Sequence, residues 1–225
     1  MQAQLIVMLT HNDLTVENSL ELFNQCKDLP VNFWGFKNVG IPDTAMRELI
    51  DAMKKEEKIT FLEVVTYTEE ECLESAKLAV EFGFDYLTGT RWFPSVAEYL
   101  KDKPIRYYPF VGDVGGSPVW LKGTIEEILE DGTRLEQAGV HGLDLVAYRY
   151  VDGDPVLLAQ RLVERATSEV IIAGSISSEE RIQIMNTINP FAFTMGGALF
   201  EERFVPGGDF RANLKRVVDI MDSLA

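Results

Sequence analysis

The sequence predicts an α/β protein, a single (β/α)8 barrel that occupies residues 1–225 as one domain. Eight short apolar runs recur along the chain, and stretches with helical period separate them. Shared among eight repeats, 225 residues give about 28 each, near the size of a strand–helix unit. A doubly wound open sheet is the alternative, but no glycine-rich dinucleotide fingerprint follows the first run.

Each apolar run is predicted to be a strand buried on both faces. The runs are rich in β-branched and aromatic residues and mostly lack the strict alternation of a half-exposed strand. In chain order they cover residues 5–9, 32–36, 59–65, 86–89, 105–111, 142–147, 170–173 and 191–195.

The helical stretches carry start and stop signals. A Ser or Thr followed three residues later by Glu predicts a capping box, and a glycine at the far end predicts a helix stop. The boxes are Thr68…Glu71, Thr124…Glu127 and Ser177…Glu180, and the stops are Gly83 and Gly139. The longest irregular stretch, residues 112–123, is a candidate lid.

The amino-acid composition excludes some classes of function and partner. With 21 Lys and Arg against 36 Asp and Glu, the net charge is −15, which disfavours binding to nucleic acid. Cys26 and Cys72 are expected to be buried, reduced thiols. No apolar stretch approaches the ~20 residues of a membrane span, so we expect no membrane partner and a cytoplasmic location. If Trp92 and Trp120 are exposed, they could form the interface of a homodimer.

The active site of such a barrel lies at the carboxyl ends of its strands. Glycines that allow close backbone approach stand after the last two strands, each before a helix whose first N–H groups could bind an anion. These turns contain Gly174, Ser175 and Ser177, and then Gly196 and Gly197. The alternative is that the glycines serve only tight packing.

With these turns, the chain resembles the ribulose-phosphate-binding barrel superfamily. That superfamily includes isomerases of histidine and tryptophan biosynthesis and pentose-phosphate epimerase. The resemblance implies that a substrate phosphate binds at the two turns. Many members have two glycines after the seventh strand, where this chain has Gly174 and Ser175.

Lys37 and Glu63 are the first catalytic candidates, because each is a charged residue after strongly apolar residues on neighbouring strands. A lysine and a carboxylate within reach of one another could polarise a carbonyl and move protons. The alternative is a structural ion pair that joins two strands. His11 and Asp113 are candidates for the partner acid or base, although Asn12 and Asp13 could instead cap a helix.

Arg91 and Arg149 follow the fourth and sixth strands and could bind anionic groups of the substrate in a bidentate fork. No cofactor is predicted and no metal ligand is assigned. A divalent metal stays open if Asp13, Glu63 or Asp144 converge.

The function predicted is an enzyme that acts on a phosphorylated, sugar-phosphate-like small metabolite. The reaction would be an isomerisation or a carbon–carbon lysis through an enol-type intermediate. Two alternatives remain open: a regulatory barrel that binds a phosphorylated ligand without turnover, and a metal-dependent lyase.

Overall fold

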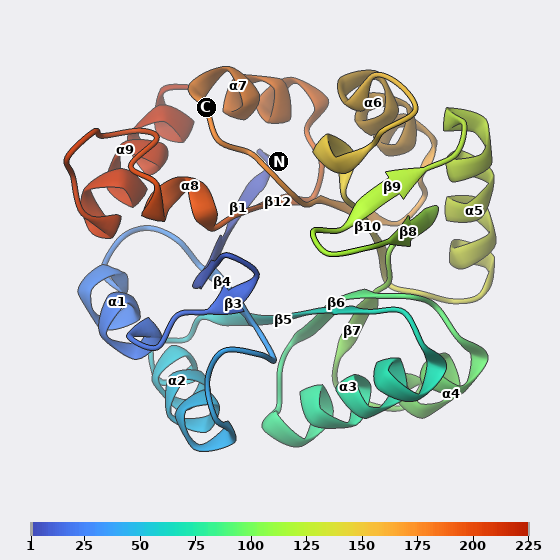
Figure 1. The fold of residues 1–225 in the computed structure, drawn as a ribbon, viewed down its shortest axis with the longest axis horizontal. Helices are drawn as coiled ribbons and strands as arrows, with labels where there is room; N and C mark the ends of the chain where they lie inside the picture. The colour runs from blue at the N-terminus through green and yellow to red at the C-terminus, as the bar shows by residue number, and fades with distance from the viewer. Residues whose placement is uncertain (1, 225) are drawn as a thin grey trace. The chain divides into compact units, whose positions relative to one another are not determined.

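The computed structural model describes residues 2–224, in which strands and helices alternate (Figure 1). The chain divides into two compact units. Unit 1 holds the residues up to Thr60 and those from Ser175 onward, and unit 2 is Phe61–Gly174. The single domain stays a prediction.

Unit 1 is built around a parallel sheet with β1 (Gln4–Met8) at its centre. On one side β1 pairs with β4 (Phe33–Lys37) and on the other with β12 (Ala192–Met195). Every residue of β4 is buried, which fits a strand covered on both faces. The helices of this unit are α1 (Ser19–Cys26), α2 (Asp43–Lys55), α7 (Glu179–Ile188), α8 (Gly197–Phe200) and α9 (Phe210–Ser223).

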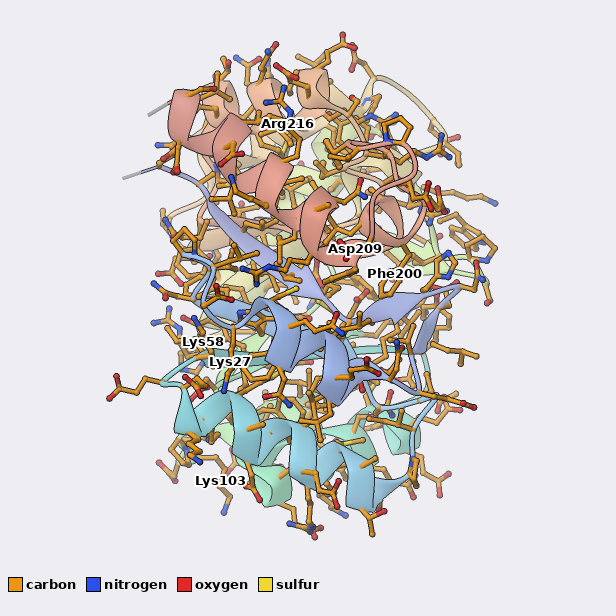
Figure 2. All side chains as sticks on the ribbon, turned by 90° about the vertical axis from the view of Figure 1, so that its left-hand side faces the viewer. Lys27, Lys58, Lys103, Phe200, Asp209 and Arg216 are labelled. Atoms are coloured by element: carbon orange, nitrogen blue, oxygen red, sulfur yellow. The ribbon has the colours of Figure 1, made fainter. Side chains whose placement is uncertain are left out.

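In unit 1, side chains cap α7 and α9, whereas α1, α2 and α8 have no side-chain cap. Asp209 caps α9 by accepting the backbone N–H of Ala212 at 2.7 Å. Lys27, which follows α1, forms an exposed ion pair of 2.7 Å with Glu56, which follows α2. Lys27, Asp209 and Arg216 lie at the outer surface in Figure 2, so charge is carried on the solvent side of these helices.

Unit 2 contains five parallel strands. Strand β5 (Ile59–Thr66, beginning two residues before the unit) pairs with β6 (Tyr86–Thr90), which pairs with β7 (Arg106–Tyr108). Just after β7, Phe110 bridges in parallel to Asp144 of β10 (Gly142–Leu145), and β10 pairs with β11 (Glu169–Ile172). The helices are α3 (Glu69–Phe82), α4 (Pro94–Leu100), α5 (Ile125–Gln137), α6 (Pro155–Arg165) and the 3-10 turn η1 (Ala147–Arg149).

These elements confirm the α/β class and the (β/α)8 barrel. All eight predicted strands are present as parallel strands, and their ends differ from the prediction by only a few residues. Cys26 and Cys72 are buried and free, as predicted, and burial raises the pKa of the Cys26 thiol to about 11. No helix within residues 2–224 is long and apolar enough to cross a membrane.

One of the three predicted capping boxes, Thr124…Glu127, has both of its hydrogen bonds, whereas Thr68 caps its helix without a bond from its backbone N–H to Glu71. Thr68 and Thr124 cap α3 and α5 through the N–H groups of their Glu partners, and Gly83 ends α3 with a left-handed φ of 73°. The third box is wrong by one residue. Ser178, not Ser177, has the extended backbone of a cap and accepts the N–H of Arg181.

The candidate lid is an ordered β-hairpin, which corrects the prediction of an irregular stretch. Its strands are β8 (Asp113–Gly115) and β9 (Trp120–Lys122). The Tyr67 hydroxyl donates to the carbonyl of Gly116 at 2.7 Å, and the N–H of Val151 donates to the carbonyl of Leu121 at 3.1 Å. The hairpin is therefore tied to two neighbouring segments of unit 2.

A second short hairpin, β2 (Thr10–His11) and β3 (Leu14–Thr15), follows β1. Asn12 and Asp13 form its two-residue turn with φ values of 50° and 64°. Two consecutive positive φ angles define the turn that matches the twist of paired strands, and Asn and Asp tolerate it. The idea that Asn12 and Asp13 cap a helix is therefore wrong, because α1 begins after Asn18.

Candidate active site

Lys37 lies at the carboxyl end of β4 and is almost fully buried, with 6% of its surface exposed. Its ammonium donates to Asp13 Oδ1 at 2.8 Å. The Thr15 hydroxyl accepts from the backbone N–H of Lys37 at 2.9 Å and donates to its carbonyl at 2.7 Å. These contacts fix the backbone of Lys37, and they place a charged amine at the end of an apolar strand.

Asp13 reaches Lys37 because of the turn in the β2–β3 hairpin. Its side chain is about half exposed (54%) whereas that of Lys37 is 8% exposed, so the ion pair joins a buried charge to the solvent. Glu63 is half-buried on β5 and belongs to unit 2. Its predicted proximity to Lys37 stays a prediction.

His11 belongs to the same hairpin as Asp13. Its ring stacks on Phe200 at 5.2 Å between centroids, and its Nε2 lies 4.0 Å from Glu201 Oε1. Glu201 also pairs with Arg203 at 2.9 Å. Phe200 and Glu201 were missed by the sequence analysis, since neither shows a motif; only their closeness to the Gly196–Gly197 turn could have indicated them.

The turn after β12 leaves backbone donors available. The N–H groups of Gly196, Gly197 and Ala198 have no acceptor among the described residues. A Cβ on Gly196 would lie 2.7 Å from the carbonyl oxygen of Thr10, so this glycine is required for packing. A Cβ on Gly197 would meet only Glu201 Oε1, at 3.7 Å. The packing alternative therefore accounts for Gly196 but not for Gly197.

The turn after β11 has the backbone of a glycine pair although its second residue is a serine. Gly174 has φ 84° and Ser175 has φ 58°, in the left-handed region that glycine adopts most readily. From α7, Arg181 donates to the carbonyl of Ser175 and reaches Ser177 Oγ at 3.5 Å. Arg181 was missed because the cap was assigned to Ser177; a cap at Ser178 places Arg181 in the first turn.

Arg149 ends η1, just after β10. Its Nε is buried without a hydrogen-bond partner, and its side chain forms no ion pair with any residue the structure describes. A Cβ on Gly174 would lie 3.4 Å from the Cγ of Arg149 and 3.7 Å from its Nε. Arg149 therefore brings an unpaired positive charge to the turn after β11.

Arg91 and Asp113 are brought together by the structure. Arg91 Nη2 lies 3.1 Å from Asp113 Oδ1 and also donates to the carbonyl of Val114 in β8. Both residues line an open groove of about 550 Å³ in unit 2, with Lys122 and Arg134 among its other walls. The negative charge of Asp113 neutralises the positive charge of Arg91, so Arg91 is less available to an external anion than Arg149.

Metal ligands do not gather in the described part of the chain, where no group of three or more His, Cys, Asp or Glu side chains could hold an ion. The assignment of catalytic and binding residues as a whole stays a prediction. Among residues 2–224 the structure shows available N–H groups after β12 in unit 1 and, separately, an arginine without an ion pair beside Gly174 in unit 2.

No family model and no curated protein matches the sequence. Solved structures do match over most of the chain. An orotidine 5'-phosphate decarboxylase from Pyrococcus horikoshii OT3 has a TM-score of 0.72 at 11% identity, covering 97% of this chain and 99% of that one.

Two further matches are an N-acetylmannosamine-6-phosphate 2-epimerase from Clostridium perfringens and a phosphoribosylanthranilate isomerase from Thermotoga maritima. The epimerase has a TM-score of 0.65 at 12% identity, over 90% of this chain and 92% of that one. The isomerase has a TM-score of 0.63 at 12% identity, over 98% and 99%. At these identities the likeness shows the fold alone, a (β/α)8 barrel.

Proposed function

We propose that the protein is an enzyme that acts on a phosphorylated small metabolite, either as an isomerase or as a carbon–carbon lyase. The phosphate would bind at the turns after β11 and β12, and the reaction would pass through an enol-type intermediate. The three solved structures described above are named for a decarboxylation, an epimerisation and an isomerisation. Their names support a catalytic barrel and leave the reaction of this chain undecided.

The observation that carries the proposal is the unpaired Arg149 beside Gly174. In a chain of net charge −15, carboxylates are abundant, and Arg106 and Arg91 each pair with one. A guanidinium with a buried Nε and no partner is costly unless something binds it. A doubly charged oxyanion fits such a fork, and the free N–H groups of Gly197 and Ala198 would add donors of the kind anions bind.

Lys37 is the group best suited to the reacting carbonyl. Asp13 holds its ammonium at 2.8 Å and Thr15 holds its backbone, and an ammonium placed in this way would donate strongly to an oxygen that gains negative charge. Glu63 would remove the proton from the adjacent carbon, and His11 or Asp113 would return one. The enolate oxygen would then be stabilised by the Lys37 ammonium, and no external oxidant is required.

Solvent exchange tests this chemistry without a known product. The protein is incubated in D2O with a panel of ketose and aldose phosphates, and proton NMR follows the hydrogen next to the carbonyl. We expect exchange with at least one compound, loss of exchange in Lys37→Met, and near-normal exchange in the control variant Lys27→Met, whose lysine lies in an exposed ion pair.

The regulatory alternative makes a different prediction for the same experiment. A barrel that binds a phosphorylated ligand without turnover would show calorimetric binding and no exchange with any compound in the panel. Exchange that persists in Lys37→Met would overturn the role of Lys37, even where the substrate class is right.

A further inference from the structure

The open groove of unit 2 has charged side chains of both signs in its walls. It lies between α5, the β8–β9 hairpin and the segment that follows β6. Its volume of about 550 Å³ is within the roughly 300–1,000 Å³ of small-molecule sites. Its charged residues are the cations Arg91, Lys122 and Arg134 and the acids Asp113, Glu127 and Asp131.

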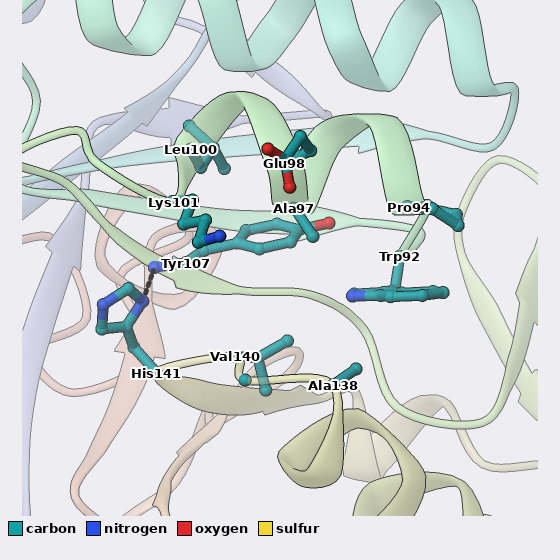
Figure 3. Close-up of a pocket in the computed structure, with 11 residues that line it drawn as sticks. Trp92, Pro94, Ala97, Glu98, Leu100, Lys101, Tyr107, Ala138, Val140 and His141 are labelled. Atoms are coloured by element: carbon teal, nitrogen blue, oxygen red, sulfur yellow. Dashed lines mark hydrogen bonds between the residues drawn. The ribbon is translucent and has the colours of Figure 1, made fainter.

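The charged groups of this groove are accessible to a ligand. The side chains of Arg91 and Arg134 are 39% and 54% exposed, and Lys122 is exposed as well. A neighbouring hollow beside α4 is different, because Tyr107 in its wall is only 2% exposed and the indole N–H of Trp92 is buried (Figure 3). The groove therefore offers charged groups that a ligand can reach without rearrangement of the walls.

Two of the three acids in the groove already accept hydrogen bonds from the protein. Asp131 uses both oxygens, since Oδ1 accepts from Nε and Nη2 of Arg134 and Oδ2 accepts from the N–H of Gly112. Glu127 Oε2 accepts from the N–H and from the hydroxyl of Thr124. The negative charge of these two residues is therefore largely balanced by donors of the chain itself.

The three cations, in contrast, keep donors without an acceptor. Arg91 donates only through Nη2, to Asp113 Oδ1 and to a carbonyl of β8, and its Nε and Nη1 have no acceptor in the described part of the chain. Arg134 Nη1 has none there either. Lys122 forms no ion pair with any residue from 2 to 224. The groove therefore presents cationic donors from three separate elements.

Asp113 places a carboxylate beside two of these cations. It is directly opposite Lys122 in the register of the hairpin, and it pairs with Arg91 at 3.1 Å. Its side chain is 63% exposed, and an exposed ion pair is weak because water screens it. A carboxylate that belongs to a ligand can therefore compete with Asp113 for the same two cations.

We propose that the groove is a binding site for a small molecule with two or three carboxylates, separate from the turns proposed to bind phosphate. One carboxylate would bind the open edge of Arg91 and the Lys122 ammonium, and another would bind Arg134 Nη1. Separate carboxylates can meet cations on three elements, whereas a phosphate dianion would concentrate its charge at one place near Asp113. The site rests on these contacts alone and is independent of the proposed function.

The experiment uses the full chain and tricarballylate, a propane chain with three carboxylates, as the probe. Butyrate, with one carboxylate, and inorganic phosphate are the comparison ligands. Because the net charge of −15 repels a trianion, its binding requires a local group of cations. Calorimetry at low ionic strength measures the Kd, where electrostatic binding is least screened.

Two tryptophans report on the groove, and ¹⁵N NMR follows their indole signals. The Lys122 ammonium lies 4.4 Å from the centre of the Trp120 ring, and the Arg134 guanidinium lies 5.3 Å from that of Trp92. Trp34 belongs to unit 1 and donates to a backbone carbonyl at 3.1 Å, so its signal is an internal reference. We expect tricarballylate to shift the first two signals and not the third, and butyrate to bind at least tenfold more weakly.

Lys122→Gln should weaken the binding of tricarballylate about fivefold, and the loss should shrink in high salt. Lys103→Gln is the matched control, because Lys103 is an exposed lysine of unit 2 that also lies over a ring, that of Tyr99 at 5.5 Å, and does not line the groove (Figure 2). It should leave the Kd unchanged. Asp113→Asn should tighten binding several-fold, because it removes the competing carboxylate.

Four results would overturn the proposal. The first is no binding at millimolar tricarballylate, and the second is an equal loss in the two lysine variants. The third is equal affinity for phosphate or butyrate, which would show that one anionic group is sufficient. The fourth is a loss in Arg149→Met as large as that in Lys122→Gln, since the probe would then bind at the site proposed for phosphate.

Discussion

Replacing Arg149 by methionine tests whether this arginine binds phosphate or stabilises the fold. Methionine keeps an unbranched apolar chain against Gly174 and removes the guanidinium, which has no ion pair among the described residues. A hydrogen bond to a charged group contributes about 1.5–3 kcal/mol, so phosphate should bind about 10- to 100-fold more weakly. Without phosphate the free energy of unfolding should not fall, because the variant removes a buried Nε that has no partner.

Arg106→Met is the matched control, because Arg106 is an arginine of unit 2 that does have partners. It pairs with Glu169 at 2.7 Å and stacks over the rings of Tyr86 and Tyr108. Its loss should lower the free energy of unfolding by about 1–2 kcal/mol, the sum of a partly exposed ion pair and a cation–π contact. The Kd for phosphate should not change.

The assays are isothermal titration with inorganic phosphate at low ionic strength, where electrostatic binding is least screened, and urea unfolding. The reasoning is refuted if Arg149→Met costs as much stability as Arg106→Met, because the guanidinium then serves the fold. It is refuted equally if the Kd for phosphate is the same in Arg149→Met and the unaltered protein.

Three further outcomes follow from single residues. Ser175→Gly should raise the free energy of unfolding by up to about 1 kcal/mol in urea, because the left-handed backbone of Ser175 costs a serine more than a glycine; a loss of stability would contradict this. Glu201→Gln should tighten phosphate binding several-fold at low salt, since its carboxylate lies beside Gly197, and the gain should shrink in high salt. The lowered pKa of His141 means that the unfolded state binds its proton first, so stability is fully present above pH 6.5 and falls as the pH drops below it. His141→Gln should flatten this part of the pH–stability curve, and an unchanged curve would refute the assignment.

The strands could be predicted from the sequence because burial on both faces leaves a direct record in composition. Residues of β4 such as Trp34 and Phe36 are fully buried, and nothing polar precedes Lys37 on that strand. The helix caps at Thr68 and Thr124 could also be predicted from the sequence, because such a cap is a local interaction between residues three apart.

The predictions that the structure corrected concern features that depend on backbone conformation. Ser177 has a glutamate three residues later, whereas Ser178 has Arg181 there, and yet the extended backbone of Ser178 makes Ser178 the cap. The contact of Asp13 with Lys37 depends on two positive φ angles in the β2–β3 turn. An Asn-Asp pair between two extended residues is typical of such a turn. In the sequence, however, Asn12 and Asp13 follow a predicted strand, where a strand–helix unit is expected to have a helix cap.

Arg149 shows what a sequence can and cannot tell about a charged residue. Its position after the sixth strand was sufficient to predict a place at the carboxyl ends of the strands. Whether an arginine is paired depends on which carboxylates the fold brings near it, and in a chain with 36 Asp and Glu residues most arginines would find one. Arg91 pairs with Asp113, and Arg149 pairs with no carboxylate among residues 2–224.

The central claim is that one phosphate is bound by the turns after β11 and β12 together. Backbone ¹H–¹⁵N NMR during a phosphate titration tests it most directly, with the amide signals of Ser175, Gly197 and Ala198 followed separately. The account predicts that all three signals move along one binding curve with a single Kd, which weakens in Arg149→Met. Movement of one turn alone, or two different Kd values for the two turns, would contradict it.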